Sequence, residues 1–185
     1  HSVQLEGGTS AQSRRGNVGL SVPTSGCRGG CEDSLNEYRR TYVTVSHTGD
    51  WESLGYSDTY LQREESENKS REMTIVNTTF KSSLATNIGN HMVTTGVDAN
   101  HAELEDFTSN KASSKTETSN TQWAVFIEDE WTIVEPFSLT LGGRLDHDEN
   151  YGSHFSPRAY GVWRIDPAWT LKGGVATGFR SPQLR

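Results

Sequence analysis

Long runs of alternating side chains constrain this sequence most strongly. From Trp169, every second residue to Phe179 is apolar or small, whereas the residues between them include Lys172 and Arg180. A period of two residues is typical of a β-strand with two different faces. Similar runs recur along the whole chain, and no segment repeats apolar residues at helical spacing. The pattern predicts an all-β, antiparallel, up-and-down fold of roughly nine strands.

Short and long connections alternate between the expected strands. Four are short and rich in turn residues, at 47–53, 85–90, 135–137 and 166–169. The segments 10–36 and 107–120 are long, polar connections, and 67–70 and 152–154 are shorter polar ones. Outer-membrane barrels have this asymmetry, with short periplasmic turns and longer outer loops. The connections therefore favour a membrane barrel.

Sorting the expected strands by face gives one apolar face and one charged face. Trp123, Val125, Ile127 and Trp131 share a side, with Phe126 on the other. The charged face carries Glu128, Glu130, Arg144, Asp146, Asp148, Arg158, Arg164, Lys172 and Arg180. A soluble sandwich would turn the apolar face inward, and a membrane barrel would turn it to lipid. Strand length, aromatic residues at strand ends and glycines within strands favour the barrel.

Composition limits the function classes. Apolar residues make up 32% of the 185 residues and the mean hydropathy is −0.69, values that are low for a soluble chain with a full core. The net charge of −7 argues against a nucleic-acid partner. The chain shows no catalytic motif, so we expect no enzyme and no cofactor.

Two short clusters have metal-binding residue types. Cys27 and Cys31 lie between glycines and charges, which favours a small disulfide in a surface loop, with a metal site or free thiols as alternatives. His147, Glu149 and His154 lie close in sequence, but their spacing fits no metal cage, which favours a solvated loop. We therefore expect no metal site.

From Val125 to Arg185 the sequence resembles TonB-dependent outer-membrane receptors. The segments EDEW, GGRLDHDE, SPRAY and KGGVATGFRSPQLR carry the resemblance, which is greatest to the catecholate siderophore branch that includes the ferric enterobactin and colicin I receptors. It implies a 22-stranded barrel with an N-terminal plug, located in the bacterial outer membrane. Residues 1–185 would be a middle section of that barrel, with the plug and the remaining strands outside it.

The resemblance also implies a ligand and partners. The ligand would be an anionic ferric catecholate siderophore, with iron present only as part of that ligand. The plug would link the receptor to the TonB complex, lipid would surround the barrel, and a colicin or a phage could use the outer loops. Two other functions are compatible with the alternation: a diffusion porin or related barrel, and a soluble all-β binding or adhesion domain.

The family supplies candidate ligand-binding residues. Its YR motif matches Tyr38 and Arg39 in YRRTY and assigns Arg39 to the ligand, while the next outer loop offers Lys69 and Arg71. Cations and aromatic rings suit an anionic catecholate. The structural alternative is that Arg39 or Arg40 pairs with a wall carboxylate. The charged face, in turn, would contact the plug or balance its own charges within the wall.

Overall fold

The computed structural model describes residues 1–16, 34–107 and 116–181, so Cys27 and Cys31 lie outside the described residues. One antiparallel sheet contains nine strands in chain order, each hydrogen-bonded to its sequence neighbours. The strands are β1 (Ser2–Gly16), β2 (Ser34–Asp50), β3 (Tyr56–Asn68), β4 (Met73–Ile88), β5 (His91–Asp106), β6 (Glu117–Val134), β7 (Phe137–Asp148), β8 (Gly152–Asp166) and β9 (Trp169–Ala176). The expected all-β, up-and-down architecture is confirmed.

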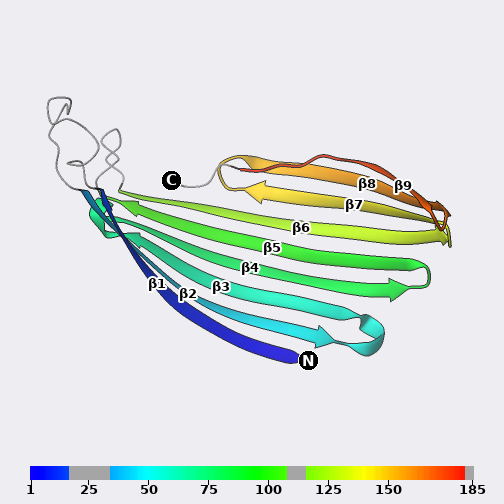
Figure 1. Cartoon of the computed structure of the whole chain (residues 1–185), viewed down its shortest axis with the longest axis horizontal. Coiled ribbons are helices and arrows are strands. Elements are labelled where there is room, and N and C mark those ends of the chain that lie inside the picture. Colours follow the sequence, from blue (N-terminus) through cyan, green and yellow to red (C-terminus); the bar gives the residue numbers. More distant parts are fainter. Residues whose placement is uncertain (17–33, 108–115, 182–185) are drawn as a thin grey trace.

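Turns of different length lie at the two ends of the sheet. Figure 1 shows a curved sheet with β1 and β9 at its two edges. The short connections join β2 to β3, β4 to β5, β6 to β7 and β8 to β9, as the alternation predicted. A 3₁₀ turn, η3 (Glu52–Leu54), lies in one of them, and a second, η4 (Lys69–Arg71), joins β3 to β4 at the opposite end. Among the described residues, no helix is long and apolar enough to cross a membrane.

Several strands are longer than the alternation indicated. β1 continues to Gly16, β2 begins at Ser34 and β6 begins at Glu117, within segments expected to be loops. Polar strand ends are typical where a barrel strand rises above the bilayer, because a membrane crossing needs only about 9–11 residues. β9 is shorter than the alternation indicated, because it ends at Ala176 although the alternating pattern continues to Phe179. Phe179 was expected on the lipid side, but it lies against the ring of His154 and lines the concave face.

The convex face carries an apolar band. Large side chains on this face are exposed on every strand, including Val43, Val45, Leu61, Phe80, Val97, Val125, Ile127, Leu141, Leu145, Phe155, Trp163, Leu171 and Val175. On β6 the band lies between Trp123 and Trp131. Their separation along the strand is about 27 Å at ~3.4 Å per residue, or about 21 Å in height at a tilt of about 40°. A barrel's apolar band is about 25 Å tall.

The described residues do not enclose a hydrophobic core. Leu104 and Ala124 are the only hydrophobic side chains among them that are buried. A soluble sandwich would cover its apolar face with a second sheet. The strands here form a single sheet whose apolar face stays open, which is the arrangement of a barrel wall in contact with lipid.

Candidate functional site

The concave face of the sheet is the candidate functional surface. Antiparallel registers place Asp98 beside Ala124, and Ala124 beside Asp146, so alternate residues of β5, β6 and β7 share this face. Ala124 is buried here, whereas its neighbours Trp123 and Val125 are exposed on the convex face. The sheet therefore separates polar and apolar side chains, as the sequence predicted for a lumen and a lipid side.

A group of ion pairs occupies the middle of the concave face. Arg144 donates one hydrogen bond to Asp98 at 2.6 Å and another to Asp146 at 2.8 Å. The Arg158 guanidinium lies 2.9 Å from a carboxylate oxygen of Glu128. These residues line a hollow of about 650 Å³. These ion pairs balance charge within the wall, and contact of Arg144, Arg158 and Glu128 with a plug stays a prediction.

Two aromatic rings lie beside cations in the same hollow. The Arg144 guanidinium is 5.8 Å from the centre of the Phe126 ring, and the Lys81 ammonium is 6.0 Å from that of Tyr60. Phe126 covers Gly96, where an added Cβ would lie 2.3 Å from the ring. The absence of a side chain at Gly96 leaves room for the Phe126 ring, which lies beside Arg144.

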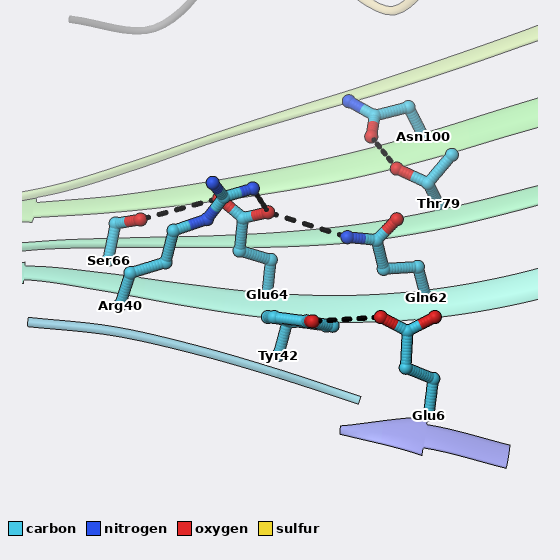
Figure 2. Close-up of polar contacts among 8 residues, drawn as sticks. All are labelled: Glu6, Arg40, Tyr42, Gln62, Glu64, Ser66, Thr79 and Asn100. Carbon is cyan, nitrogen blue, oxygen red and sulfur yellow. Dashed lines mark hydrogen bonds and ion pairs between the residues drawn. The ribbon is translucent and has the colours of Figure 1, made fainter. Parts of the chain in front are cut away.

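A second polar group links β1, β2 and β3, and a separate hydrogen bond beside it links β4 to β5. Figure 2 shows Tyr42 donating a hydrogen bond to Glu6 at 2.8 Å and Arg40 in an ion pair with Glu64. Gln62 and Ser66 also donate to the Glu64 carboxylate, and Thr79 donates to Asn100 at 2.9 Å. The Arg40 side chain remains 55% exposed, so it can be reached from the lumen despite its partner.

The proposed ligand-binding residues lie on different faces. Tyr38 shares the concave side with Arg40, because Tyr38 pairs with Asn68 and Arg40 pairs with Ser66. Arg39 alternates with them and lies on the convex side, near the end of the sheet that carries the long connections. Its role in ligand binding stays a prediction. Arg40, the structural alternative in the same motif, does pair with a wall carboxylate.

Lys69 and Arg71 lie in η4, at the rim. Arg71 approaches Asp106 of β5 at 3.9 Å, and its role in ligand binding stays a prediction. The hydroxyl of Ser70 between them donates to the Leu35 carbonyl at 2.8 Å and accepts from the Glu37 amide at 3.0 Å. These bonds fix the turn against β2. Lys69 is exposed, and its ligand role stays a prediction.

The other predicted lumen residues follow the same alternation. Glu130 lies opposite Thr140, Arg164 opposite Thr170, and Lys172 opposite Val162, all on the concave side. Within residues 1–16, 34–107 and 116–181 the side chains of these three residues have no ion-pair partner. Arg180 lies beyond β9 and lines a second hollow of about 610 Å³. Whether they contact a plug stays a prediction.

The residues of DHDENYGSH do not converge on one point. His147 shares a hydrogen bond with Ser153 at 2.9 Å on the convex face, and His154 donates to the Tyr151 carbonyl at 3.1 Å on the concave face. Glu149 accepts from the Thr121 amide at 3.1 Å. No group of metal-ligating side chains forms in the described part of the chain.

Asp148 instead organises this turn. Its side chain is 1% exposed and accepts hydrogen bonds from the side chain of Asn120 at 3.1 Å and from the amides of Asn150 and Tyr151 at 2.8 and 3.1 Å. Sequence reasoning placed Asp148 on the charged face but missed this role. Its position three residues before Tyr151 in a polar turn is the local signal, since aspartate commonly binds backbone amides in turns.

Sequence reasoning also missed four concave residues that complete the polar groups, namely Glu6, Glu64, Lys81 and Asp98. Each lies on a strand whose faces were not sorted. Extending the alternation to β1, β3, β4 and β5 would have placed them on the charged face, but their partners depend on register.

Comparison with known proteins decides the family. The family described as TonB dependent receptor-like, β-barrel, matches residues 9–185. The chain belongs to the TonB-dependent receptor β-barrel family. Proteins of this family are outer-membrane receptors rather than enzymes, and the membership replaces the alternatives of a diffusion porin and a soluble domain.

Curated relatives agree with this membership. The chain is 65% identical over 185 residues to the iron-regulated outer membrane virulence protein of Vibrio cholerae, in two strains. It is 31% identical over 61 residues to a probable TonB-dependent siderophore receptor PirA of Acinetobacter baumannii, across 33% of this chain and 8% of that protein. The chain spans 28% of the length of the Vibrio protein.

Solved structures share the fold. A ferric enterobactin receptor (PfeA) of Pseudomonas aeruginosa, mutant G324V, aligns with a TM-score of 0.82 at 20% identity, over 97% of this chain and 31% of that one. The siderophore receptor PirA of Pseudomonas aeruginosa aligns with a TM-score of 0.76 at 24% identity, over 81% and 28%. The nine-stranded sheet thus corresponds to a section of a receptor barrel.

Proposed function

We propose that this chain forms part of the wall of a receptor that takes up a ferric catecholate siderophore and is energised through TonB. Outer loops capture the anionic complex, and the lumen passes it to a plug. That plug is coupled to an inner-membrane partner. Iron enters only as part of the ligand, and a colicin or a phage could use the same loops.

The observation that carries the proposal is the set of concave side chains near the long connections. Tyr38, Arg40 and Tyr42 project from alternate positions of β2 into the lumen side. Phenol rings suit the aryl groups of a catecholate, and a guanidinium suits its negative charge. The names of the relatives, which include ferric enterobactin receptors, support the same ligand class.

Charge along the wall supports a direction of passage. The hollow lower on the concave face contains Asp58, Asp98 and Asp146, and Arg144 bonds to two of these carboxylates. Of the three cations in this hollow, Lys81, Arg144 and Arg158, the two arginines are ion-paired. The three cations stand against four carboxylates in total, so the lining is net negative and disfavours an anionic ligand. Binding at the level of Arg40, followed by weak interaction below it, fits capture at the outer end and release toward a plug.

The test compares neighbouring arginines in the full-length receptor. Arg40→Ala should reduce uptake of a ferric catecholate at limiting ligand by several-fold and leave uptake of a neutral ferric hydroxamate at its own basal level. Arg39→Ala is the matched control for geometry, because the same residue type lies on the opposite face. If Arg39→Ala alone reduces uptake, the assignment implied by resemblance is right and the geometric one is wrong. If neither Arg40→Ala nor Arg39→Ala reduces uptake of the ferric catecholate, the proposed role of a cation in capture is wrong.

A further inference from the structure

The chain leaves the sheet after β9 and turns onto the concave face. Residues 177–181, which we call the lumenal strap, lie outside the strands. The Thr177 amide still donates to the Pro157 carbonyl of β8 at 3.1 Å. Two residues later, the Phe179 ring stacks on the His154 ring, with the ring centres 3.8 Å apart. This contact brings Phe179 to the lumen side, whereas continued strand alternation would take it to the lipid side.

Contacts with two strands hold the lumenal strap in place. Besides the Thr177 hydrogen bond and the ring stack on β8, the Ser181 hydroxyl donates to the Asp148 carboxylate of β7. Asp148 is buried, and His154 is fixed by its own hydrogen bond to the Tyr151 carbonyl at 3.1 Å. The strap therefore crosses from β8 toward β7 over the lumen side instead of following the edge of β8.

The outer half of β8 has a strand edge beside the lumenal strap. Pairing of β8 with β9 ends where Arg158 lies opposite Ala176. Among the described strands, residues 152–156 pair with β7 alone. The open backbone groups of a strand edge favour pairing with another segment. Because the strap follows β9 directly, an extension of β9 through the strap would cover this edge.

The sequence of the lumenal strap suits this second position. Continuing the antiparallel register of β8 with β9 places Phe179 opposite Phe155 and Arg180 opposite His154. Phe155 is 65% exposed on the convex face, so Phe179 would pack beside it in the apolar band. Aromatic pairs across neighbouring strands stabilise a sheet. Phe179 thus has an aromatic partner in both positions, and the two partners are adjacent residues on opposite faces of β8.

The lumenal strap lies between two hollows of the concave face. Residues 177–179 line the hollow of about 650 Å³, and residues 179–181 line the second hollow of about 610 Å³. Phe179 borders both. A ligand that moves from one hollow to the other therefore meets the strap, and the extension of β9 would withdraw Phe179 from its way.

We propose that the lumenal strap exchanges between its place across the lumen and an extension of β9 along β8, and that the extended position opens the way between the two hollows. The role in ligand passage rests on the proposed function, whereas the exchange itself does not. The lumenal position keeps the stack on His154 and the Ser181 hydrogen bond. The extended position replaces them by backbone pairing with β8 and by packing on Phe155. A ligand in the hollows favours the extended position, because it competes only with the lumenal one.

Two cysteine pairs in the full-length receptor test the exchange. Phe179→Cys is combined either with His154→Cys, on the concave face, or with Phe155→Cys, on the convex face. Loss of the Phe179 ring removes an aromatic contact from both positions alike, so the comparison favours neither. A short, reducible thiol cross-linker is added to the receptor in vesicles, and the linked peptides are identified by mass spectrometry. Phe179→Cys alone is the control for links to other cysteines.

We expect both pairs to form the cross-link. Ser181→Ala should raise the yield of the link between positions 179 and 155 about threefold, because it removes a contact of the lumenal position alone. A link from only one of the two pairs would overturn the exchange, since the strap would then occupy a single position.

Uptake of a ferric catecholate tests the role in passage. Linking positions 179 and 154 should reduce uptake about tenfold, and reduction of the cross-linker should restore it. Linking positions 179 and 155 should leave uptake close to that of the same variant without the link. Equal uptake by the two linked forms would overturn the role in passage. If the wild type takes up no ferric catecholate, the proposed function is wrong, and the cross-link yields alone still decide the exchange.

Discussion

Replacing Arg144 by glutamine should destabilise the barrel wall measurably. Arg144 donates charge-assisted hydrogen bonds to Asp98 and Asp146 at 2.6 and 2.8 Å. A hydrogen bond to a charged group contributes about 1.5–3 kcal/mol when buried, and an exposed ion pair about 0.2–1 kcal/mol. Because the Arg144 side chain is 38% exposed, intermediate values apply to each bond. We expect a total loss of about 2 kcal/mol, since the change also leaves two carboxylates without their cation.

The assay is urea unfolding of the full-length receptor refolded in lipid vesicles, followed by tryptophan fluorescence. Arg164→Gln is the matched control, because Arg164 lies on the same face without an ion pair among the described residues, and it should change the free energy by less than about 0.5 kcal/mol. A double-mutant cycle with Asp98→Asn should give a coupling of about 1 kcal/mol. Equal stability of the Arg144 and Arg164 variants would refute the assignment of a stabilising ion pair.

Two further substitutions and one mass measurement test other parts of the protein. Gly96→Val should impair assembly of the barrel, because the new Cβ would lie 2.3 Å from the Phe126 ring and 2.8 Å from a backbone oxygen. Adding Phe126→Ala should restore assembly only in part, since the backbone clash remains. A normal yield of the Gly96→Val variant would contradict the contact. Asp148→Ala should make the neighbouring outer turn more sensitive to external protease. The reason is that the Asn120 side chain and the amides of Asn150 and Tyr151 lose their acceptor, at a cost of about 2 kcal/mol or more. An unchanged cleavage rate would contradict the role of Asp148 in holding the turn. Mass spectrometry of the unreduced protein should show Cys27 joined to Cys31, and free thiols there would disprove the disulfide.

Alternation predicted the strands and their faces because the side-chain period of a strand is fixed by its backbone. Trp123, Ile127, Glu128 and Arg144 therefore lie on the faces that the sequence indicated. Alternation predicts strand ends poorly, since polar strands above the bilayer resemble loops. The end of β9 was missed for the opposite reason. An apolar residue, Phe179, continues the pattern after the strand has ended.

Contacts between strands could not be predicted from local patterns. Asp98 and Arg144 are 46 residues apart, and their contact depends on the registers of two successive strand pairs. His91 and Asp129 are 38 residues apart, and their contact depends on the register of β5 with β6. Register also decides which arginine of YRRTY faces the lumen. A motif match selected Arg39, whereas the pairing of β2 with β3 places Arg40 on the concave side.

The central claim is that the two faces of this sheet meet different media, lipid outside and an aqueous lumen inside. Spin labels at Ile127 and Glu128, neighbours on β6, test it in the full-length receptor in vesicles. The account predicts that the label at Ile127 is accessible to oxygen dissolved in lipid, and that the label at Glu128 is accessible to a water-soluble nickel complex. The same accessibility at both positions, or the reverse pattern, would contradict the account.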